Sequence, residues 1–162
     1  MRPVAAHRGD VAALQRAFAA GAPVDARDAR GRTALHVATF ARQHEAIRLL
    51  ARAGAKLGAL ENDRYDGTAL IAAAHLGHDG VVRQLIRAGA PLDHVNDLHW
   101  TALIESIVLG NGGPRHQATL KALLDAGASW RLTDRQGRTP LELARAHGHD
   151  AMQQMLEAAG AR

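Results

Sequence analysis

The chain has no cysteine, and only five of its 162 residues are aromatic. The absence of cysteine excludes disulfides, cysteine-ligated zinc and thiol catalysis, and it leaves the redox compartment open. Because large side chains are scarce, alanine must do much of the close packing, which favours thin layers over one deep core. The sequence also contains no run of about 18 apolar residues, so it predicts no transmembrane helix.

Lysine is nearly absent as well, since 18 of the 20 basic residues are arginine and the net charge is +4. So small an excess is compatible with nucleic acid but does not require it. The opening "MRPVAAHRGD" has no long apolar stretch, so it does not read as a secretory leader. We therefore expect a cytoplasmic protein. The alternative is a periplasmic or secreted protein whose leader was trimmed before Met1, because the chain starts inside a predicted helix.

Two short markers recur at nearly constant spacing. A Gly-Ala pair begins at residues 21, 54, 89, 127 and 160, with spacings of 33, 35, 38 and 33 residues. A second marker begins at residues 33, 68, 101 and 139, where the chain reads "TALHVA", "TALIAA", "TALIES" and "TPLELA". Self-similarity at such a period is the signature of a repeat array.

Each marker has a physical role in a pair of helices. The threonine of the second marker suits a helix N-cap, because its hydroxyl can accept from the unpaired N–H groups of the first turn. The leucine two residues later is expected to point into the stack. A glycine then separates the two helices at Gly9, Gly77, Gly110 and Gly148, whereas the second repeat has Arg42 there. The glycine of the Gly-Ala pair permits a left-handed C-terminal cap, and the polar segment that follows predicts a tight turn or hairpin.

The helix start, the Gly-His pairs in "LGH" and "HGH" and the closing Gly-Ala together resemble the ankyrin repeat. The resemblance implies an all-α solenoid of about five stacked helix-turn-helix repeats with short β-hairpin or turn connections. It predicts a single domain over 1–162, with repeats at approximately 1–28, 29–61, 62–95, 96–133 and 134–162. Each helix pair cannot hide its own apolar face, so stacking on neighbours must complete the core.

Two segments depart from this period. The connection "GALENDRYDG" has two extra residues, and "GNGGPRHQA" in the fourth repeat has five. The second segment lacks the lysine and the Ser/Thr of a P-loop. It predicts a flexible loop over Gly110–Gln117 that projects from the far end of the helices, as a tolerated insertion or a secondary contact.

Catalysis and metal binding have little support. In the ankyrin pattern His36, His78 and His149 are structural. A metal would need three or four converging ligands, and no pair of histidines has a compelling i, i+4 spacing, so His75 with His99 is the only pair from different repeats that merits inspection. Glu105 stands where other repeats carry Val37, Ala72 and Leu143. Without a partner carboxylate or a nucleophile, a binding or solvent-facing role is expected for Glu105. We predict no enzyme activity, no metal and no cofactor.

The resemblance also implies a concave binding face, formed by the hairpin tips and the first helix of each repeat. Three of the five aromatic residues fall on it, whereas Phe18 and Trp130 fall at core positions. Aromatic residues and arginine dominate interface energetics, so the scarce aromatics suggest a hot spot. The expected contact residues, carried over from the family's variable positions, are Arg30, Arg32, Phe40, Arg64, Tyr65, His75, Leu76, Leu98, Trp100, Val108, Leu109, Arg135 and Arg138.

The sequence therefore predicts a monomeric, non-enzymatic module that binds a partner protein through this concave face, in a regulatory, adaptor or effector role. The alanine- and arginine-rich composition suggests a bacterial source. The alternative is a basic face that binds nucleic acid or another acidic ligand. Acidic residues interleave with the arginines of the connections, which weakens that alternative. No membrane partner is expected.

Overall fold

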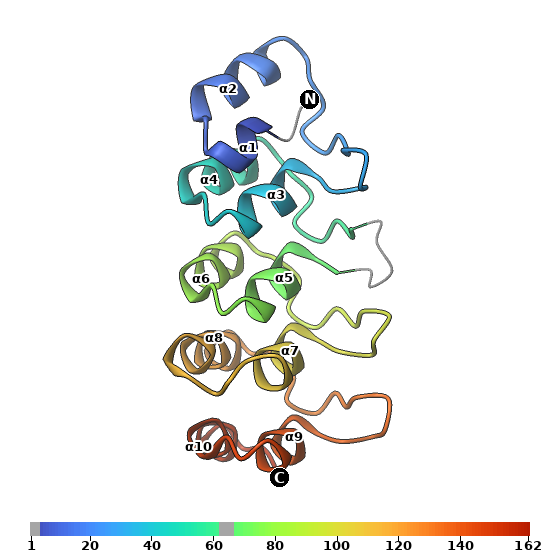
Figure 1. The fold of residues 1–162 in the computed structure, drawn as a ribbon, viewed down its shortest axis with the longest axis vertical. Coiled ribbons are helices and arrows are strands. Elements are labelled where there is room, and N and C mark those ends of the chain that lie inside the picture. Colours follow the sequence, from blue (N-terminus) through green and yellow to red (C-terminus); the bar gives the residue numbers. More distant parts are fainter. Residues whose placement is uncertain (1–3, 62–66) are drawn as a thin grey trace.

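The computed structural model describes residues 4–61 and 67–162, and over these residues it contains ten helices arranged in five pairs (Figure 1). The first helices of the pairs are α1 (Val4–Arg8), α3 (Ala34–Phe40), α5 (Ala69–His75), α7 (Ala102–Val108) and α9 (Pro140–Ala146). The second helices are α2 (Val11–Ala19), α4 (His44–Arg52), α6 (Asp79–Arg87), α8 (Pro114–Asp125) and α10 (Asp150–Ala158).

The five pairs stack into an elongated array with two columns of helices. Each first helix packs against the next first helix, from α1 through α9, and each second helix does the same from α2 through α10. The connecting turns project from the side of the first helices (Figure 1). We call the surface made by the first helices and these turns the first-helix face. The predicted ankyrin-type solenoid is confirmed.

The threonine N-caps are also confirmed. Thr33, Thr68, Thr101 and Thr139 each have an extended backbone, and each side-chain oxygen accepts from the N–H three residues on, at 3.2–3.4 Å. These bonds satisfy a helix N–H that has no partner inside the helix. In the second repeat the His36 ring completes the cap, because its Nδ1 accepts from the Thr33 N–H at 3.1 Å while Nε2 lies 2.9 Å from the Ala59 carbonyl. His36 is structural, as the pattern implied.

The predicted leucines fill the core. Leu35, Leu70, Leu103 and Leu141 are at most 2% exposed, and small buried alanines such as Ala38, Ala73 and Ala144 let the helices approach closely. Phe18 and Trp130 lie half-buried against this core. The core is therefore a continuous layer of moderate side chains that runs along the array.

The turn between the two helices of a pair needs a left-handed residue. Gly77 has φ +64° and Gly148 has φ +67°, and the second repeat places Arg42 in the same conformation at φ 56°. The departure at Arg42 therefore leaves the turn unchanged but puts a side chain in a region that L-residues avoid.

The connections between pairs are turns, and the described residues contain no strand, only one isolated bridge between Arg27 and Thr33. An aspartate organises two of these turns. Asp28 Oδ1 accepts from the N–H groups of Arg30 and Arg32, and Asp134 Oδ1 accepts from those of Gln136 and Arg138. In each case the arginine four residues after the aspartate, Arg32 or Arg138, also pairs its guanidinium with that aspartate, at 2.8 Å.

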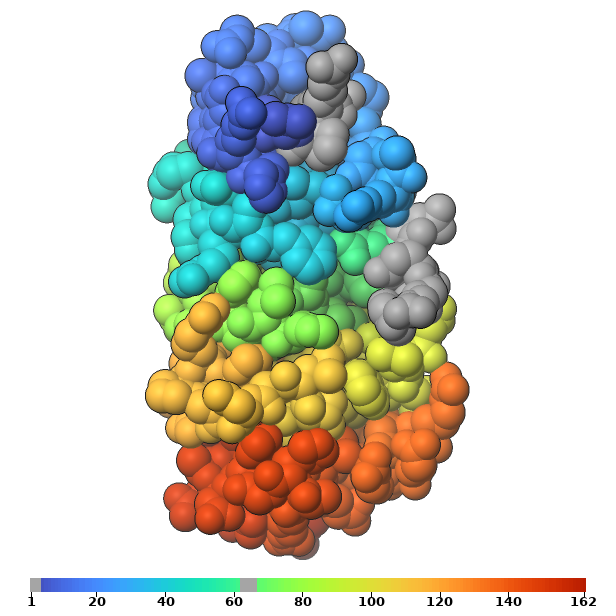
Figure 2. Space-filling view, viewed as in Figure 1, coloured from blue at the N-terminus to red at the C-terminus, as the bar shows by residue number. Residues whose placement is uncertain are grey.

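The insertion in the fourth repeat differs from the prediction. Only part of Gly110–Gln117 is a loop, because α8 begins at Pro114 and is longer than the other second helices. Proline is well suited to the first position of a helix. The start of α8 does not project freely: Arg115 Nε donates to the Gly77 carbonyl at 3.1 Å, and His116 Nε2 lies 2.9 Å from the His75 carbonyl. In Figure 2 the orange start of α8 rises alongside the green third repeat.

No helix in the described part of the chain is long and apolar enough to cross a membrane.

Candidate interaction site

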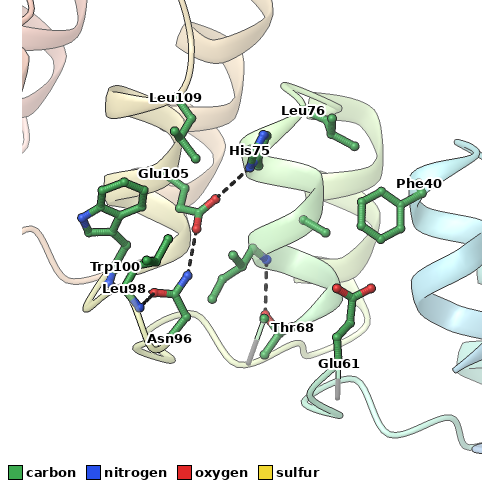
Figure 3. A pocket seen from close by; sticks show the side chains of 13 residues that line it. Phe40, Glu61, Thr68, His75, Leu76, Asn96, Leu98, Trp100, Glu105 and Leu109 are labelled. Atoms are coloured by element: carbon green, nitrogen blue, oxygen red, sulfur yellow. Dashed lines mark hydrogen bonds and ion pairs between the residues drawn. The ribbon is translucent and has the colours of Figure 1, made fainter. Parts of the chain in front are cut away.

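The first-helix face contains a pocket of about 440 Å³ between the second, third and fourth repeats (Figure 3). Phe40 and Glu61 stand on its α3 side, and Leu98, Trp100 and Leu109 stand on its α7 side. The central helix α5 contributes its exposed face. The full lining comprises Phe40, Glu61, Gly67, Thr68, Ile71, Ala72, His75, Leu76, Asn96, Leu98, Trp100, Glu105 and Leu109.

Large apolar side chains surround the pocket and remain exposed. Phe40 is 41% exposed, Leu109 is 40% and Leu98 is 37%, and only two other large apolar residues among those described, Val4 and Val95, are classed as exposed. Trp100 is half-buried because one part of it packs against the core. Clustered exposed apolar side chains are typical of a surface that binds another molecule.

Three polar side chains form a chain of contacts in the pocket. Asn96 Nδ2 donates to Glu105 Oε1 at 2.8 Å, and Glu105 Oε2 lies 3.3 Å from His75 Nδ1 (Figure 3). Asn96 and Glu105 are buried, whereas half of the His75 side chain is exposed. The solvent-facing alternative for Glu105 is therefore wrong, because this carboxylate lies at the floor of the pocket.

Asn96 also shapes the turn on which the pocket wall stands. Its Oδ1 accepts from the N–H groups of Leu98 and Trp100, both at 3.0 Å. This is the role that Asp28 and Asp134 have in other turns, but here the ion pair with arginine is missing because Trp100 takes the arginine position. The amide is thus free to donate to Glu105, which a carboxylate cannot do.

The electrostatics of these groups follow from their contacts. The hydrogen bond with Glu105 raises the pKa of His75 above its ordinary value, and its charge adds to that effect, although burial opposes it. Burial by itself raises the pKa of the Asp28 and Asp134 carboxyls. Backbone N–H donors and the paired arginines outweigh it, so both pKa values lie below the usual range.

The structure brings six of the predicted contact residues together in the pocket: Phe40, His75, Leu76, Leu98, Trp100 and Leu109. Arg30 and Arg32 line a neighbouring hollow of about 340 Å³ that shares Phe40 and Glu61 with the first. Val108 packs against the core, outside the pocket. The predicted contacts at Arg64 and Tyr65 lie outside the described residues.

Several of the predicted arginines have contacts within the array. Arg32 and Arg138 pair with the aspartates of their own turns, and Arg135 Nη2 donates to the Asp97 carbonyl of the preceding connection at 2.7 Å. Arg30 is exposed. The Arg32 and Arg138 side chains remain partly exposed, but their aspartate partners neutralise much of the positive charge along these turns.

The sequence prediction missed Asn96 and Glu61. Both are found by aligning the connections, because each takes the position of Asp28 and Asp134, whose N–H donates to a carbonyl across the turn. The Asn96 N–H donates to the Trp100 carbonyl, and the Glu61 N–H donates to the Gly67 carbonyl. Over the described residues, no group of three or more His, Asp or Glu side chains is arranged to hold a metal ion. Of the pair His75 and His99 considered for a metal, His75 contacts the Glu105 carboxylate.

Known proteins share both the sequence pattern and the fold. A family model described as ankyrin repeats (3 copies) matches residues 4–96 and 43–131. The chain is 32% identical to the ankyrin repeat protein YahD of Escherichia coli (strain K12), with 98% of this chain and 94% of that protein aligned. It is also 32% identical to human ankyrin repeat and SOCS box protein 16, over 88% of this chain but only 32% of that protein.

A solved structure agrees with these matches. An ankyrin repeat domain from Acinetobacter baumannii AYE superposes with a TM-score of 0.65 at 38% identity, covering 99% of this chain and 97% of that one. The family match extends over most of the chain, and the bacterial relative matches nearly end to end. The protein therefore belongs to the ankyrin repeat family.

Proposed function

We propose that this protein is a non-enzymatic binding module that docks a partner protein on its first-helix face, with the pocket between α3, α5 and α7 as the centre of the interface. Ankyrin repeats are generally protein–protein interaction modules, which supports the class of function. A module that only binds would act as a regulator, adaptor or effector. The bacterial relatives support a bacterial source.

One observation carries the choice of face. Three of the exposed large apolar side chains surround the same pocket, although Phe40 comes from the second repeat and Leu98 and Leu109 come from the fourth. The exposure of these side chains does not contribute to the packing of the repeats. Burying them against a partner would be favourable, at about 25 cal/mol per Å² of apolar surface. A rigid, preformed surface also loses little entropy on docking.

The test is affinity capture from the native host, followed by binding measurements with the purified partner. A triple variant, Phe40→Ser, Leu98→Ser and Leu109→Ser, changes only exposed side chains, so we expect it to fold. Truncating such anchors should cost about 2 kcal/mol or more in binding, which is roughly thirtyfold. Val4→Ser is the matched control, since Val4 is exposed and apolar but does not line the pocket.

A partner that binds the triple variant as tightly as the wild type would contradict the proposed face. The salt dependence of binding distinguishes a protein partner from the alternative, an acidic ligand. An acidic ligand such as nucleic acid held by the arginines would lose orders of magnitude in affinity between about 50 and 200 mM salt. A protein held by the pocket should change much less over the same range.

A further inference from the structure

The pocket combines an apolar wall with an acidic floor. Ile71, Leu98 and Leu109 supply the apolar surface, and Phe40 and Trp100 supply aromatic rings. Among the residues that the structure describes, the ionisable side chains that line it are His75 and the carboxylates of Glu61 and Glu105. No arginine or lysine belongs to the lining among the described residues, although the whole chain has 20 of them.

The buried carboxylate is not required by the repeat architecture. At the position of Glu105 other repeats carry Val37, Ala72 and Leu143, and their first helices pack against one another in the same column. Placing a carboxylate in a core costs free energy unless other groups compensate for its lost hydration. Asn96 and His75 provide that compensation here, and Asn96 itself departs from the aspartate found in two other turns, at Asp28 and Asp134. Coordinated departures of this kind are expected where function overrides packing.

Glu105 can accept further hydrogen bonds. A carboxylate has about four acceptor sites, and this one has contacts with Asn96 and His75. Its oxygens face the pocket (Figure 3). An apolar occupant would cover the carboxylate without pairing it, and an acidic occupant would meet like charge from Glu105. A cationic group avoids both costs.

From this arrangement we infer that the pocket receives an arginine or lysine side chain of the partner, with its aliphatic stem on the apolar wall and its cationic head directed at Glu105. The inference rests on the proposed function. Long basic side chains bury their stem and keep the charged head with polar groups, which matches the two parts of the pocket. The rings of Phe40 and Trp100 add a surface on which a cation is attracted.

The experiment uses the full chain and three small probes. N-acetyl-arginine methylamide carries the cation, N-acetyl-citrulline methylamide has nearly the same shape without charge, and N-acetyl-glutamate methylamide carries the opposite charge. Binding is followed by NMR at the His75 ring and the Trp100 indole N–H. We expect saturable shifts at both residues with the arginine probe, much weaker shifts with citrulline and none with glutamate.

Two variants identify the group responsible. Glu105→Gln keeps the shape and can still bond Asn96 and His75, so the fold should persist, which the urea midpoint checks. It should weaken the arginine probe by about tenfold or more, since a charge-assisted hydrogen bond is lost. Glu45→Gln removes an exposed carboxylate on α4, outside the pocket, and should leave binding unchanged.

Three results would overturn the inference: equal binding of citrulline, stronger binding of the glutamate probe, or no saturable shift at His75 and Trp100. The same variants separate this inference from the proposed function. If the purified partner binds Glu105→Gln normally but loses affinity for the triple variant, the basic anchor is wrong and the face is right. If neither variant affects the partner, the proposed face fails as well.

Discussion

The Asn96 side chain donates to Glu105 Oε1 at 2.8 Å and so joins the connection between α6 and α7 to helix α7 itself. The amide oxygen of Asn96 accepts from two N–H groups of its own turn, those of Leu98 and Trp100. One residue thus orders both the turn that carries Leu98 and Trp100 and the carboxylate beneath them.

Asn96→Asp should destabilise the protein, because it places a second carboxylate within hydrogen-bond distance of Glu105. The turn can still form, as it does around Asp28 and Asp134, so the cost arises from the two facing charges. We expect a loss of about 1–3 kcal/mol in the free energy of unfolding at neutral pH, measured by urea titration. The loss should shrink in acid, where a proton shared by the two carboxyls relieves the repulsion.

The double variant Asn96→Asp with Trp100→Arg is the internal control for that result. It recreates the Asp–Arg pair that closes the other two turns. A non-additive recovery of stability in a double-mutant cycle is expected. Strict additivity of the two losses would show that the turn position of Asn96 is not equivalent to that of Asp134.

Glu105→Gln should lower the pKa of His75 toward its ordinary value, because the carboxylate hydrogen bond that raises it is removed. NMR titration of the His75 ring measures this directly. A histidine whose pKa is raised by folding contributes stability that is complete below its unfolded pKa of about 6.5 and is lost as the pH rises through the folded pKa. The free energy of unfolding of the wild type should therefore exceed that of Glu105→Gln most below pH 6.5. This difference should shrink as the pH rises above neutral.

Gly77→Ala should destabilise more than Gly148→Ala, although both glycines have nearly the same positive φ. A Cβ at Gly148 meets open space, so only the left-handed strain of about 1–2 kcal/mol is expected there. A Cβ at Gly77 would lie 2.8 Å from the His116 ring and would push the ring away from its contact with the His75 carbonyl. Equal losses in urea unfolding would mean that the α8 extension does not contribute to stability.

Arg42→Gly should stabilise the protein. Arg42 is exposed and has φ 56°, in the position that glycine occupies in other repeats. Relief of the left-handed strain should exceed the added entropy of the unfolded chain, for a net gain of up to about 1 kcal/mol. Thermal unfolding measures the gain, and a fall in the melting temperature would indicate that the arginine side chain makes a stabilising contact.

Arg115→Ala should raise the pKa of His78. Burial lowers that pKa first, and the positive charges of Arg42 and Arg115 lower it further. The Arg115 guanidinium also lies 2.8 Å from His78 Nδ1. Removing this charge should therefore move the His78 titration toward the ordinary histidine value, as followed by NMR. Arg131→Ala is a matched control, because Arg131 lies over the Trp130 ring instead.

The fold was predictable because its signals are local and repeated. The threonine caps, the left-handed glycines and the core leucines each depend on residues within one turn of helix. The α8 extension was not predicted, since the glycines before it indicate a loop and the contacts of Arg115 and His116 come from another repeat. Sequence spacing alone does not reveal which distant turn a helix will contact.

The candidate site was predictable only in part. Family positions placed Phe40, Leu98 and Trp100 on one face, and the register marked Glu105 as a departure. The role of Asn96 was hidden, because its amide bonds a helix residue nine positions away while its oxygen closes a local turn. That dual use becomes visible only when the geometry of three turns is compared.

The location of the pocket across the inner repeats affects how it would survive partial unfolding. In an array where each unit is held mainly by its neighbours, melting starts at the free ends and moves inward. The pocket draws on α3, α5 and α7, so fraying of α1, α2, α9 or α10 would leave its lining in place. Hydrogen exchange should therefore be slowest around the pocket, and a chain with loosened ends should still recognise its partner.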